Sequence, residues 1–160
     1  MTKEKSKKEL TEEAQDFLLS QRVMVLSTVD PDGGPHAATV FYYLRPDRSF
    51  VFYFFSHSLT QKSQNLKMNN RAALTIFTQI DPVIVQAKGI VMPVEDEKEA
   101  NMAISKLTDI SVTSSQWYSP PISKIKAGEL KVFKVKVDWL RYADFRGLTG
   151  TPPPFHQIIP

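Results

Sequence analysis

The 160-residue sequence contains no cysteine. Disulfide bonds, thiolate catalysis, iron–sulfur clusters and cysteine-based zinc sites are therefore excluded. Histidine is scarce as well: His36, His57 and His156 are scattered along the chain. None of them has a second histidine or a carboxylate at a spacing typical of metal ligands, so we expect no metal site.

Long hydrophobic runs are also missing. No apolar segment is long enough to span a bilayer. Residues 1–13 alternate lysine with glutamate and lack the apolar centre of a signal peptide. We therefore expect a cytoplasmic protein without membrane contact. The net charge of +3 is too small to indicate a nucleic-acid partner.

The remaining composition is typical of one globular domain, with 42% hydrophobic and 23% charged residues. We expect a flexible N-terminal tail over residues 1–10, a folded domain over residues 11–146 and a proline-rich tail over residues 147–160. Residues 151–160 are expected to form no regular structure, and to be either a disordered end or an arm that packs on a partner.

Residue patterns predict six strands and three short helices. Alternating and β-branched segments predict strands at residues 23–29, 36–44, 50–55, 72–77, 83–94 and 130–140. The turn signals at 30–34 and 45–49 favour an antiparallel meander of the first three strands. Helices are predicted from Thr11 to about Ser20–Arg22, over 58–68, and from the capping box at Asp96 to Lys106.

Six strands with few helices indicate a mainly β protein with peripheral helices. A closed or nearly closed antiparallel barrel suits this pattern because it removes exposed sheet edges. Gly89 lies inside a predicted strand, which indicates a bulge or a close approach of another backbone.

Polar residues follow the aromatic third strand and precede a predicted helix. Ser56, Ser58, Thr60 and Lys62 combine hydroxyls, a cation and the free N–H groups of a helix start, which are the groups that hold a phosphate. The glycines of a Walker A loop are absent. In the alternative interpretation, Ser58 or Thr60 only caps the helix and Lys62 lies in water.

The second predicted strand contains an unusual run of small residues. Ala37, Ala38 and Thr39 would let a flat ring approach the backbone closely. Packing against the N-terminal helix is the simpler alternative.

These motifs occur in an order that resembles a known family. The series consists of Asp32-Gly33, Pro35-His36, Ser56, Thr60, Lys62, Asn65-Leu66, Asn70, Val85-Gln86 and Gly89. Over about residues 12–140 it is similar to the pyridoxamine 5'-phosphate oxidase-like, FMN-binding split-barrel family. The resemblance implies a six-stranded antiparallel split barrel, FMN as the cofactor, and a homodimer with two cofactor sites at its interface. The aromatic strand at 50–55 is a candidate for that contact, with burial in the core as the alternative.

The resemblance also implies a set of cofactor-binding residues. Thr60 and Lys62 would contact the phosphate, with Gln61 beside them where the oxidases proper carry arginine; this exchange removes a charge and a bidentate donor. The strand from His36 to Phe41 would run along the flavin, mainly through backbone groups. The implied set is His36, Ala37, Ala38, Thr39, Val40, Phe55, Ser56, Thr60, Gln61, Lys62 and Gln86.

The C-terminal residues do not match the arginine and histidine with which the oxidases hold pyridoxal phosphate. We therefore expect an FMN-dependent oxidoreductase that acts on an unidentified small molecule, with the chemistry supplied by the flavin and no independent catalytic residue visible. The alternatives are a non-catalytic flavin-binding protein and a relative that binds a deazaflavin or haem. Basic residues within 120–146 would suit a deazaflavin, and His57 or His156 would be the axial ligand of a haem.

Overall fold

The computed structural model describes residues 5–114, 128–146 and 154–160. The prediction of a mainly β fold is confirmed, but the described strands number eight and form one sheet. The strands are β1 (Val23–Val29), β2 (Pro35–Phe41), β3 (Tyr43–Leu44), β4 (Val51–His57), β5 (Arg71–Phe77), β6 (Val83–Pro93), β7 (Leu130–Asp144) and β8 (His156–Ile159). The helices are α1 (Lys7–Ser20), α2 (Gln61–Met68) and α3 (Glu97–Ser114).

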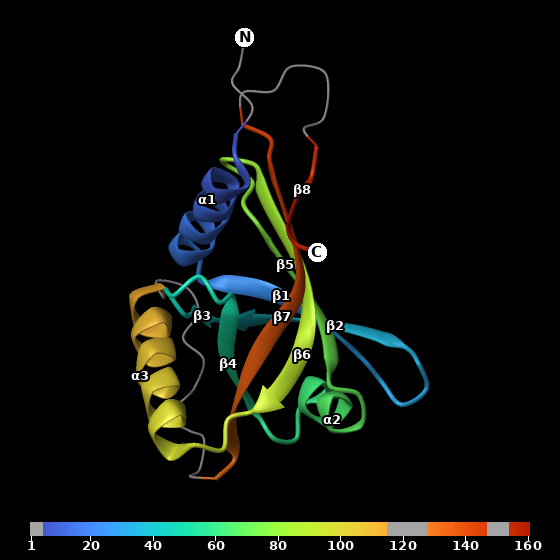
Figure 1. Ribbon diagram of the computed structural model, residues 1–160. Helices are drawn as coiled ribbons and strands as arrows, with labels where there is room; N and C mark the ends of the chain where they lie inside the picture. The colour runs from blue at the N-terminus through green and yellow to red at the C-terminus, as the bar shows by residue number, and fades with distance from the viewer. Residues whose placement is uncertain (1–4, 115–127, 147–153) are drawn as a thin grey trace.

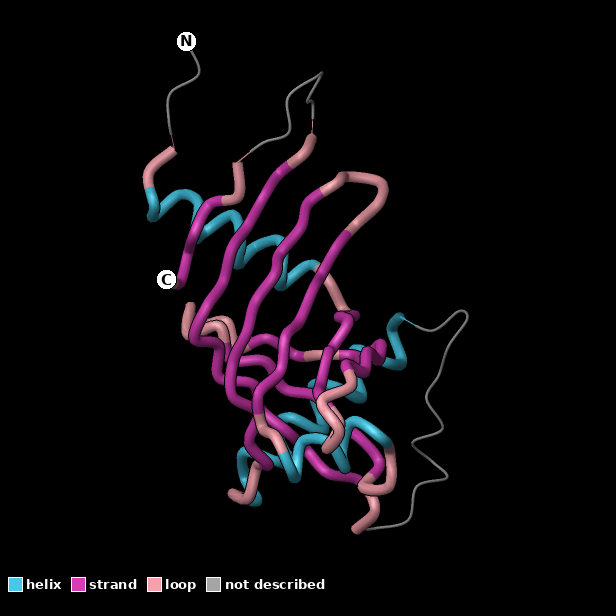
Figure 2. The backbone as a smooth tube through the Cα atoms, turned by 90° about the vertical axis from the view of Figure 1, so that its right-hand side faces the viewer, coloured by secondary structure: helices cyan, strands magenta, loops and turns pink. Residues whose placement is uncertain are grey.

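The sheet curls into a split barrel whose edges are β2 and β3. Its order is β2-β1-β5-β6-β7-β4-β3, with β8 paired to β7. All ladders are antiparallel. The long strands β5, β6 and β7 run side by side, and α1 lies behind them in Figure 2, so the face turned to the viewer is left open.

The predicted meander is wrong, because the second predicted strand breaks at Tyr42. The backbone N–H of Tyr42 donates to the carbonyl of Arg22 at 3.0 Å, and its hydroxyl donates to the carbonyl of Leu18 at 2.6 Å. These bonds hold a buried corner at which the chain leaves the β1–β2 ladder and starts a second ladder, β3 with β4. The two halves of the predicted strand thus lie at opposite ends of the sheet order.

The core lies inside the curl and is closed by α1. Leu26, Leu74, Val85 and Leu140 from neighbouring strands point inward and are almost fully buried, and Leu18 of α1 packs among them. The aromatic strand β4 contributes Phe52 and Phe54 to this core, and Phe50, just before the strand, also belongs to it. Figure 1 shows α1 across the upper strands and α3 along the lower left of the barrel.

Two helix starts differ from the predictions, and α2 begins at Gln61 and not at residue 58 because Thr60 is its cap. α1 begins at Lys7 and not at Thr11, because Ser6 and Glu9 form a complete capping box: the N–H of Glu9 donates to Ser6 Oγ, and the N–H of Ser6 donates to Glu9 Oε2. The predicted cap of α3 is present, since the N–H of Glu99 donates to Asp96 Oδ2 at 2.7 Å. α3 continues to Ser114, and residues 115–127 lie outside the described residues.

The C-terminal residues form regular structure, contrary to the prediction. The prolines before Phe155 and at Pro160 leave His156–Ile159 free to alternate, and this segment pairs as β8 with β7 of the same chain. Ile158 is buried in the core. The tail is therefore part of the sheet, because a short alternating segment gains a hydrophobic contact and a ladder at once.

The prediction for Gly89 is confirmed. The β6–β7 register shifts between Lys88 and Gly89, and a Cβ on Gly89 would collide with the backbone carbonyl of Lys136. Only glycine permits this approach. Within the described ranges, no helix is long and apolar enough to cross a membrane.

Candidate functional site

Hydroxyl groups at the corner between β4 and α2 are bonded mainly to one another. Ser56 Oγ and Thr60 Oγ1 are 2.8 Å apart, and Ser63 Oγ donates to the carbonyl of His57 at 2.9 Å. Thr60 also caps α2 by accepting the N–H of Ser63. Ser56 and Ser63 are buried. The hydroxyls therefore fix the shape of the corner, and the capping interpretation of Thr60 describes its state in this structure.

Lys62, in the first turn of α2, is the cation of this corner, and it has no counter-charge among the described residues. Its side chain is half-buried, and burial lowers the pKa of its ammonium. Within residues 5–114, 128–146 and 154–160, no acidic side chain forms an ion pair with it. The first N–H groups of a helix also lack partners within the helix. This corner thus presents a cation and backbone donors to an anion.

A buried hydrogen-bond chain ties the corner to the start of β2. Gln61 Nε2 donates to Asn65 Oδ1 at 2.8 Å, and Asn65 Nδ2 donates to Thr28 Oγ1 at 3.0 Å. Asn65 and Thr28 are fully buried, and Thr28 lies opposite His36 in the β1–β2 register. The amide of Gln61 is therefore already bonded, and Nδ1 of His36 is buried without a partner. Sequence reasoning missed Thr28, which carried no motif of its own.

Strand β2 has one edge without a partner strand, and several of its side chains are small. In the described chain it pairs only with β1, so no strand pairs with its other edge. Ala37 and Thr39 are exposed, whereas Val40 is buried in the core and offers only its backbone. This arrangement would leave room for a flat ring held by backbone groups, which stays a prediction.

Two of the residues implied by the resemblance lie away from this corner. Gln86 lies on the open face of β6, with β1 and β5 between it and β2, and it accepts a hydrogen bond from Arg141 Nε at 2.7 Å. The side chain of Phe55 packs in the cluster under α3. The structure therefore brings together β2, Ser56, Thr60, Gln61 and Lys62, but not these two side chains.

The open face also carries a row of stacked cations and rings that sequence reasoning missed. Lys88 Nζ lies 4.6 Å from the ring of Trp139, and the guanidinium of Arg141 lies 4.2 Å from the ring of Phe155. Strand alternation puts Trp139 and Arg141 on one face. Phe155 reaches them only through the β7–β8 pairing, which the sequence did not predict.

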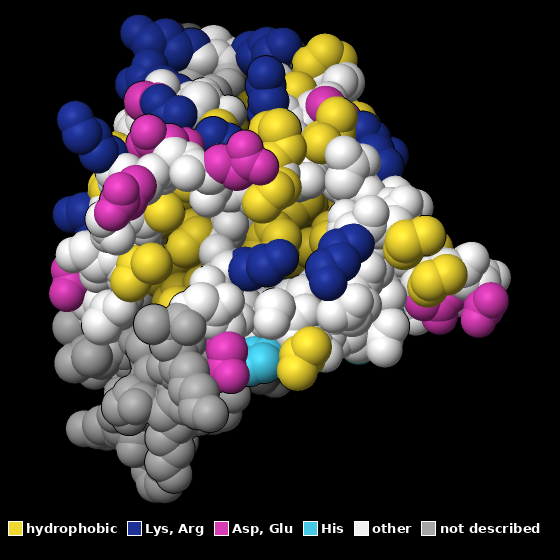
Figure 3. Space-filling view, turned by 90° about the horizontal axis from the view of Figure 1, so that it is seen from below, with side chains coloured by type: hydrophobic (Ala, Val, Ile, Leu, Met, Phe, Trp, Pro, Cys, Tyr) yellow, Lys and Arg dark blue, Asp and Glu magenta, His cyan; other side chains and the backbone are white. Residues whose placement is uncertain are grey.

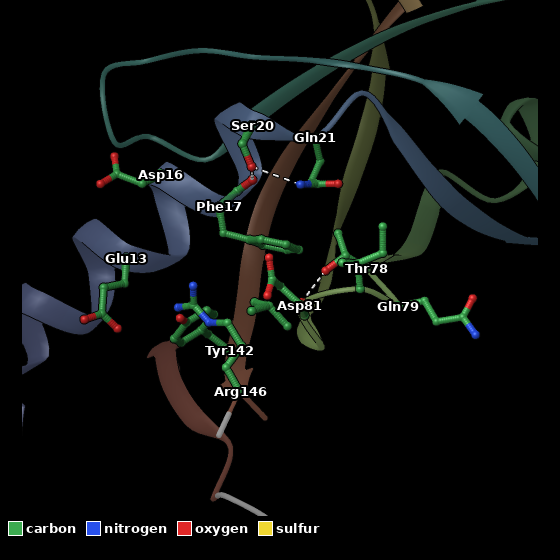
Figure 4. Close-up of a pocket in the computed structure, with 12 residues that line it drawn as sticks. Glu13, Asp16, Phe17, Ser20, Gln21, Thr78, Gln79, Asp81, Tyr142 and Arg146 are labelled. Atoms are coloured by element: carbon green, nitrogen blue, oxygen red, sulfur yellow. Dashed lines mark hydrogen bonds between the residues drawn. The ribbon is translucent and has the colours of Figure 1, made fainter. Parts of the chain in front are cut away.

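A cavity of about 710 Å³ lies elsewhere, between α1 and the β5–β6 turn (Figure 4). Its lining includes Glu13, Asp16 and Asp81. The basic group there, Arg146, is paired with Asp144 at 2.5 Å, and its hydrogen bonds lower the pKa of that carboxyl. A phosphate would meet acids and a neutralised arginine, so this cavity is a poor site for it.

Comparison with known proteins places the chain in a family. A family model described as pyridoxamine 5'-phosphate oxidase matches residues 10–144. The chain belongs to the pyridoxamine 5'-phosphate oxidase-like family. Pyridoxine/pyridoxamine 5'-phosphate oxidases from two strains of Rhodopseudomonas palustris are similar to it. The BisB18 enzyme is 37% identical over 61% of this chain and 46% of its own length, and the TIE-1 enzyme is 35% identical over 70% and 52%.

This family member spans about half the length of the curated relatives it matches. Solved structures share its split-barrel fold. A haem-binding protein from Mycobacterium smegmatis has a TM-score of 0.73 at 18% identity and covers 96% of this chain and 58% of its own. General Stress Protein 26 from Bacillus anthracis has a TM-score of 0.62 at 19% identity, with coverages of 92% and 98%.

Proposed function

We propose that this family member binds FMN at the corner formed by β2 and the start of α2, and that it is an FMN-dependent oxidoreductase for a small molecule. The single observation that carries the proposal is the cation of Lys62, which is half-buried and lacks an acidic partner in the described chain. A phosphate would supply the missing charge and accept the N–H groups of the first turn of α2.

The residues present also fit the rest of FMN. The unpaired edge of β2 offers backbone donors and acceptors to a heterocycle, and Ala37 and Thr39 leave room beside it. Thr28 and Asn65 hold α2 against β1, so the distance between the phosphate end and the ring end is fixed by buried hydrogen bonds. When bound, FMN supplies hydride transfer, and the protein positions it and limits water access.

Substitution of Lys62 tests the phosphate placement. We expect Lys62→Ala to weaken FMN binding by about 1.5–3 kcal/mol, because a charge-assisted contact is lost. The measurement is quenching of flavin fluorescence on titration of flavin-free protein. Lys67→Ala is the matched control, because Lys67 is an exposed lysine on the same helix; it should leave the affinity unchanged. Equal affinities for wild type and Lys62→Ala would show that the phosphate lies elsewhere.

Reduction of the bound flavin distinguishes an oxidoreductase from a protein that binds flavin without turnover. An oxidoreductase passes electrons through its flavin, so NADH, NADPH or another donor should bleach the visible absorbance of the bound FMN without oxygen. A flavin store would keep its absorbance with every donor. We do not propose pyridoxamine phosphate as the substrate, because the residues after Trp139 lack the substrate motif of the oxidases.

The open face of the sheet supports a homodimer as part of this proposal. Four apolar side chains on it are at least one-third exposed, namely Val23, Val25, Phe77 and Ile90. An apolar area of this kind on a flat sheet favours association with another surface. A second copy would bury it and would bring its own face against β2, where the proposed cofactor lies.

Haem is the second candidate, favoured by the fold shared with the haem-binding protein from M. smegmatis. The structure distinguishes between the two candidate axial ligands, His57 and His156. His57 accepts the N–H of Leu59 on Nδ1 at 3.1 Å, and its Nε2 faces Glu129 at 3.4 Å. Both ring nitrogens are engaged, so His156 is the better candidate. A Soret band that appears on haem addition and is lost in His156→Ala would favour haem over FMN.

A further inference from the structure

The lower mouth of the barrel forms a second cavity, which adjoins the proposed cofactor corner at Ser63. It has a volume of about 650 Å³ and lies between α2 and the adjoining ends of β6 and β7. Figure 3 views the molecule from below and shows a hydrophobic area with Lys and Arg side chains beside it. Mouths of β-barrels are common places for small-molecule sites.

One wall of this cavity is apolar, beside the polar lining residues Ser63, Asn69 and Asn70. Leu66 of α2, Val91 of β6 and Phe133 of β7 line it and are themselves almost completely buried. Phe133 stacks on Phe54 with ring centroids 5.2 Å apart, so the floor is a fixed aromatic surface continuous with the core. A ligand in this mouth would therefore contact rigid hydrocarbon and need an apolar portion to gain from it.

The rim of the cavity is basic. Lys67 of α2 and Lys131 of β7 line it, and its lining contains no acidic residue. The ammonium of Lys67 has only a 3.4 Å contact to the amide oxygen of Gln64, and neither lysine forms an ion pair within the described ranges. Lys134, on the same strand as Lys131, differs in this respect, because it is paired with Glu99 at 2.9 Å.

From these two features we infer that the barrel mouth binds a single-chain amphipathic carboxylate, with the tail on Leu66, Val91 and Phe133 and the head between Lys67 and Lys131. The apolar wall favours a ligand with a hydrocarbon tail. Two lysines without an acidic partner favour a negatively charged head group over a neutral or positively charged one. The site adjoins the one that we propose for FMN, because Ser63 lines it, but Lys62, the cation on which the FMN proposal rests, does not.

Calorimetric titration with decanoate, kept below its micelle concentration, tests this site. Decanol and decyltrimethylammonium carry the same tail with a neutral and a positive head. We expect decanoate to bind most tightly and decyltrimethylammonium not to bind. The variant Lys67→Ala/Lys131→Ala should raise the Kd of decanoate at least about tenfold, because two charge-assisted contacts are lost. Lys8→Ala/Lys98→Ala removes the same charge at exposed positions on other helices and should have no effect.

Further measurements separate this site from the cofactor site and from membranes. Met68→Glu puts an acid at an exposed position of the rim and should also weaken decanoate. Saturating FMN should leave the Kd of decanoate unchanged, and Lys67→Ala/Lys131→Ala should leave FMN binding unchanged. The inference is overturned if Lys67→Ala/Lys131→Ala and Lys8→Ala/Lys98→Ala have the same Kd for decanoate. It is also overturned if FMN displaces decanoate, or if the protein binds anionic vesicles but not monomeric decanoate.

Discussion

The outer surface of the sheet has two parts, one covered by the chain itself and one open. On the covered part, Val51, Tyr53 and Val132 of β4 and β7 pack under Ala103 and Leu107 of α3, and all five are buried. On the open part, formed by β1, β5 and β6, residues with the same strand alternation are exposed; Phe77, for example, is 53% exposed. The same backbone arrangement thus gives two different environments.

This difference assigns separate roles to the two parts. Apolar side chains under α3 stabilise the single chain, because their burial is complete without a partner. Apolar side chains on the open part gain nothing until another surface covers them. A transverse row that crosses the open part runs from Thr39 of β2 through Gln86 of β6 to Arg141 of β7. On the outer surface, the covered part therefore adds stability to the core inside the curl, and binding is expected on the open part.

The largest expected effect comes from a charge on the open part. Phe77→Asp should weaken self-association at least about 100-fold, or about 2.7 kcal/mol, because a second copy would have to bury an unpaired carboxylate. Sedimentation velocity over a range of concentrations measures it. Ile80→Asp makes a comparable change at a turn position that is 95% exposed, and should leave association intact. A wild-type protein that is monomeric at all concentrations would refute the role given to this surface.

The same substitution on each part sharpens the comparison. Val51→Ala removes two methyl groups from under α3 and should lower the free energy of unfolding by about 2 kcal/mol. Val25→Ala, on the open part, should cost less than about 0.5 kcal/mol in dilute solution. Urea denaturation of both variants gives the two values. If the cost of Val25→Ala grows with protein concentration, a second copy covers Val25. Equal costs in dilute solution would mean that the two parts do not differ.

Local features of this fold were predictable from the sequence. The strand β1 and the residue that caps α2 follow from β-branched residues and from a hydroxyl before a polar helix start. Gly89 marked a close backbone approach because a glycine inside a strand has few other causes. Each of these features depends only on residues that are close in the sequence.

Features that depend on distant partners were not predictable. Residues 36–44 read as one strand, but the bond from Tyr42 to Leu18 divides it, and the two halves join different partners. β8 is a strand only because β7 offers it an edge. In the candidate site, the corner around Thr60 and Lys62 was predicted, since its residues are consecutive. The position of Gln86, set by the order of four strands, was not.

The smallest expected effect concerns the contact that holds α3 over the covered part. Glu99 accepts hydrogen bonds from Lys134 Nζ at 2.9 Å and from the Tyr53 hydroxyl at 2.7 Å. These bonds lower the pKa of Glu99 below its ordinary value of 4.5, and burial together with the carboxylate raises the pKa of Tyr53 to about 12. A carboxyl with a lowered pKa in the folded state stabilises the fold above its unfolded pKa, and this contribution is lost as the pH falls through the folded one.

Glu99→Gln should therefore be less stable than wild type near neutral pH by at most about 1 kcal/mol, and the difference should shrink below pH 4.5 as Glu99 of the wild type takes up its proton. Urea midpoints between pH 7 and pH 3 measure it. Glu97→Gln, in the exposed first turn of the same helix, should show no such convergence. A difference between Glu99→Gln and wild type that stays constant at all pH values would mean that packing of Ala103 and Leu107, and not the ion pair, holds α3 on this part of the sheet.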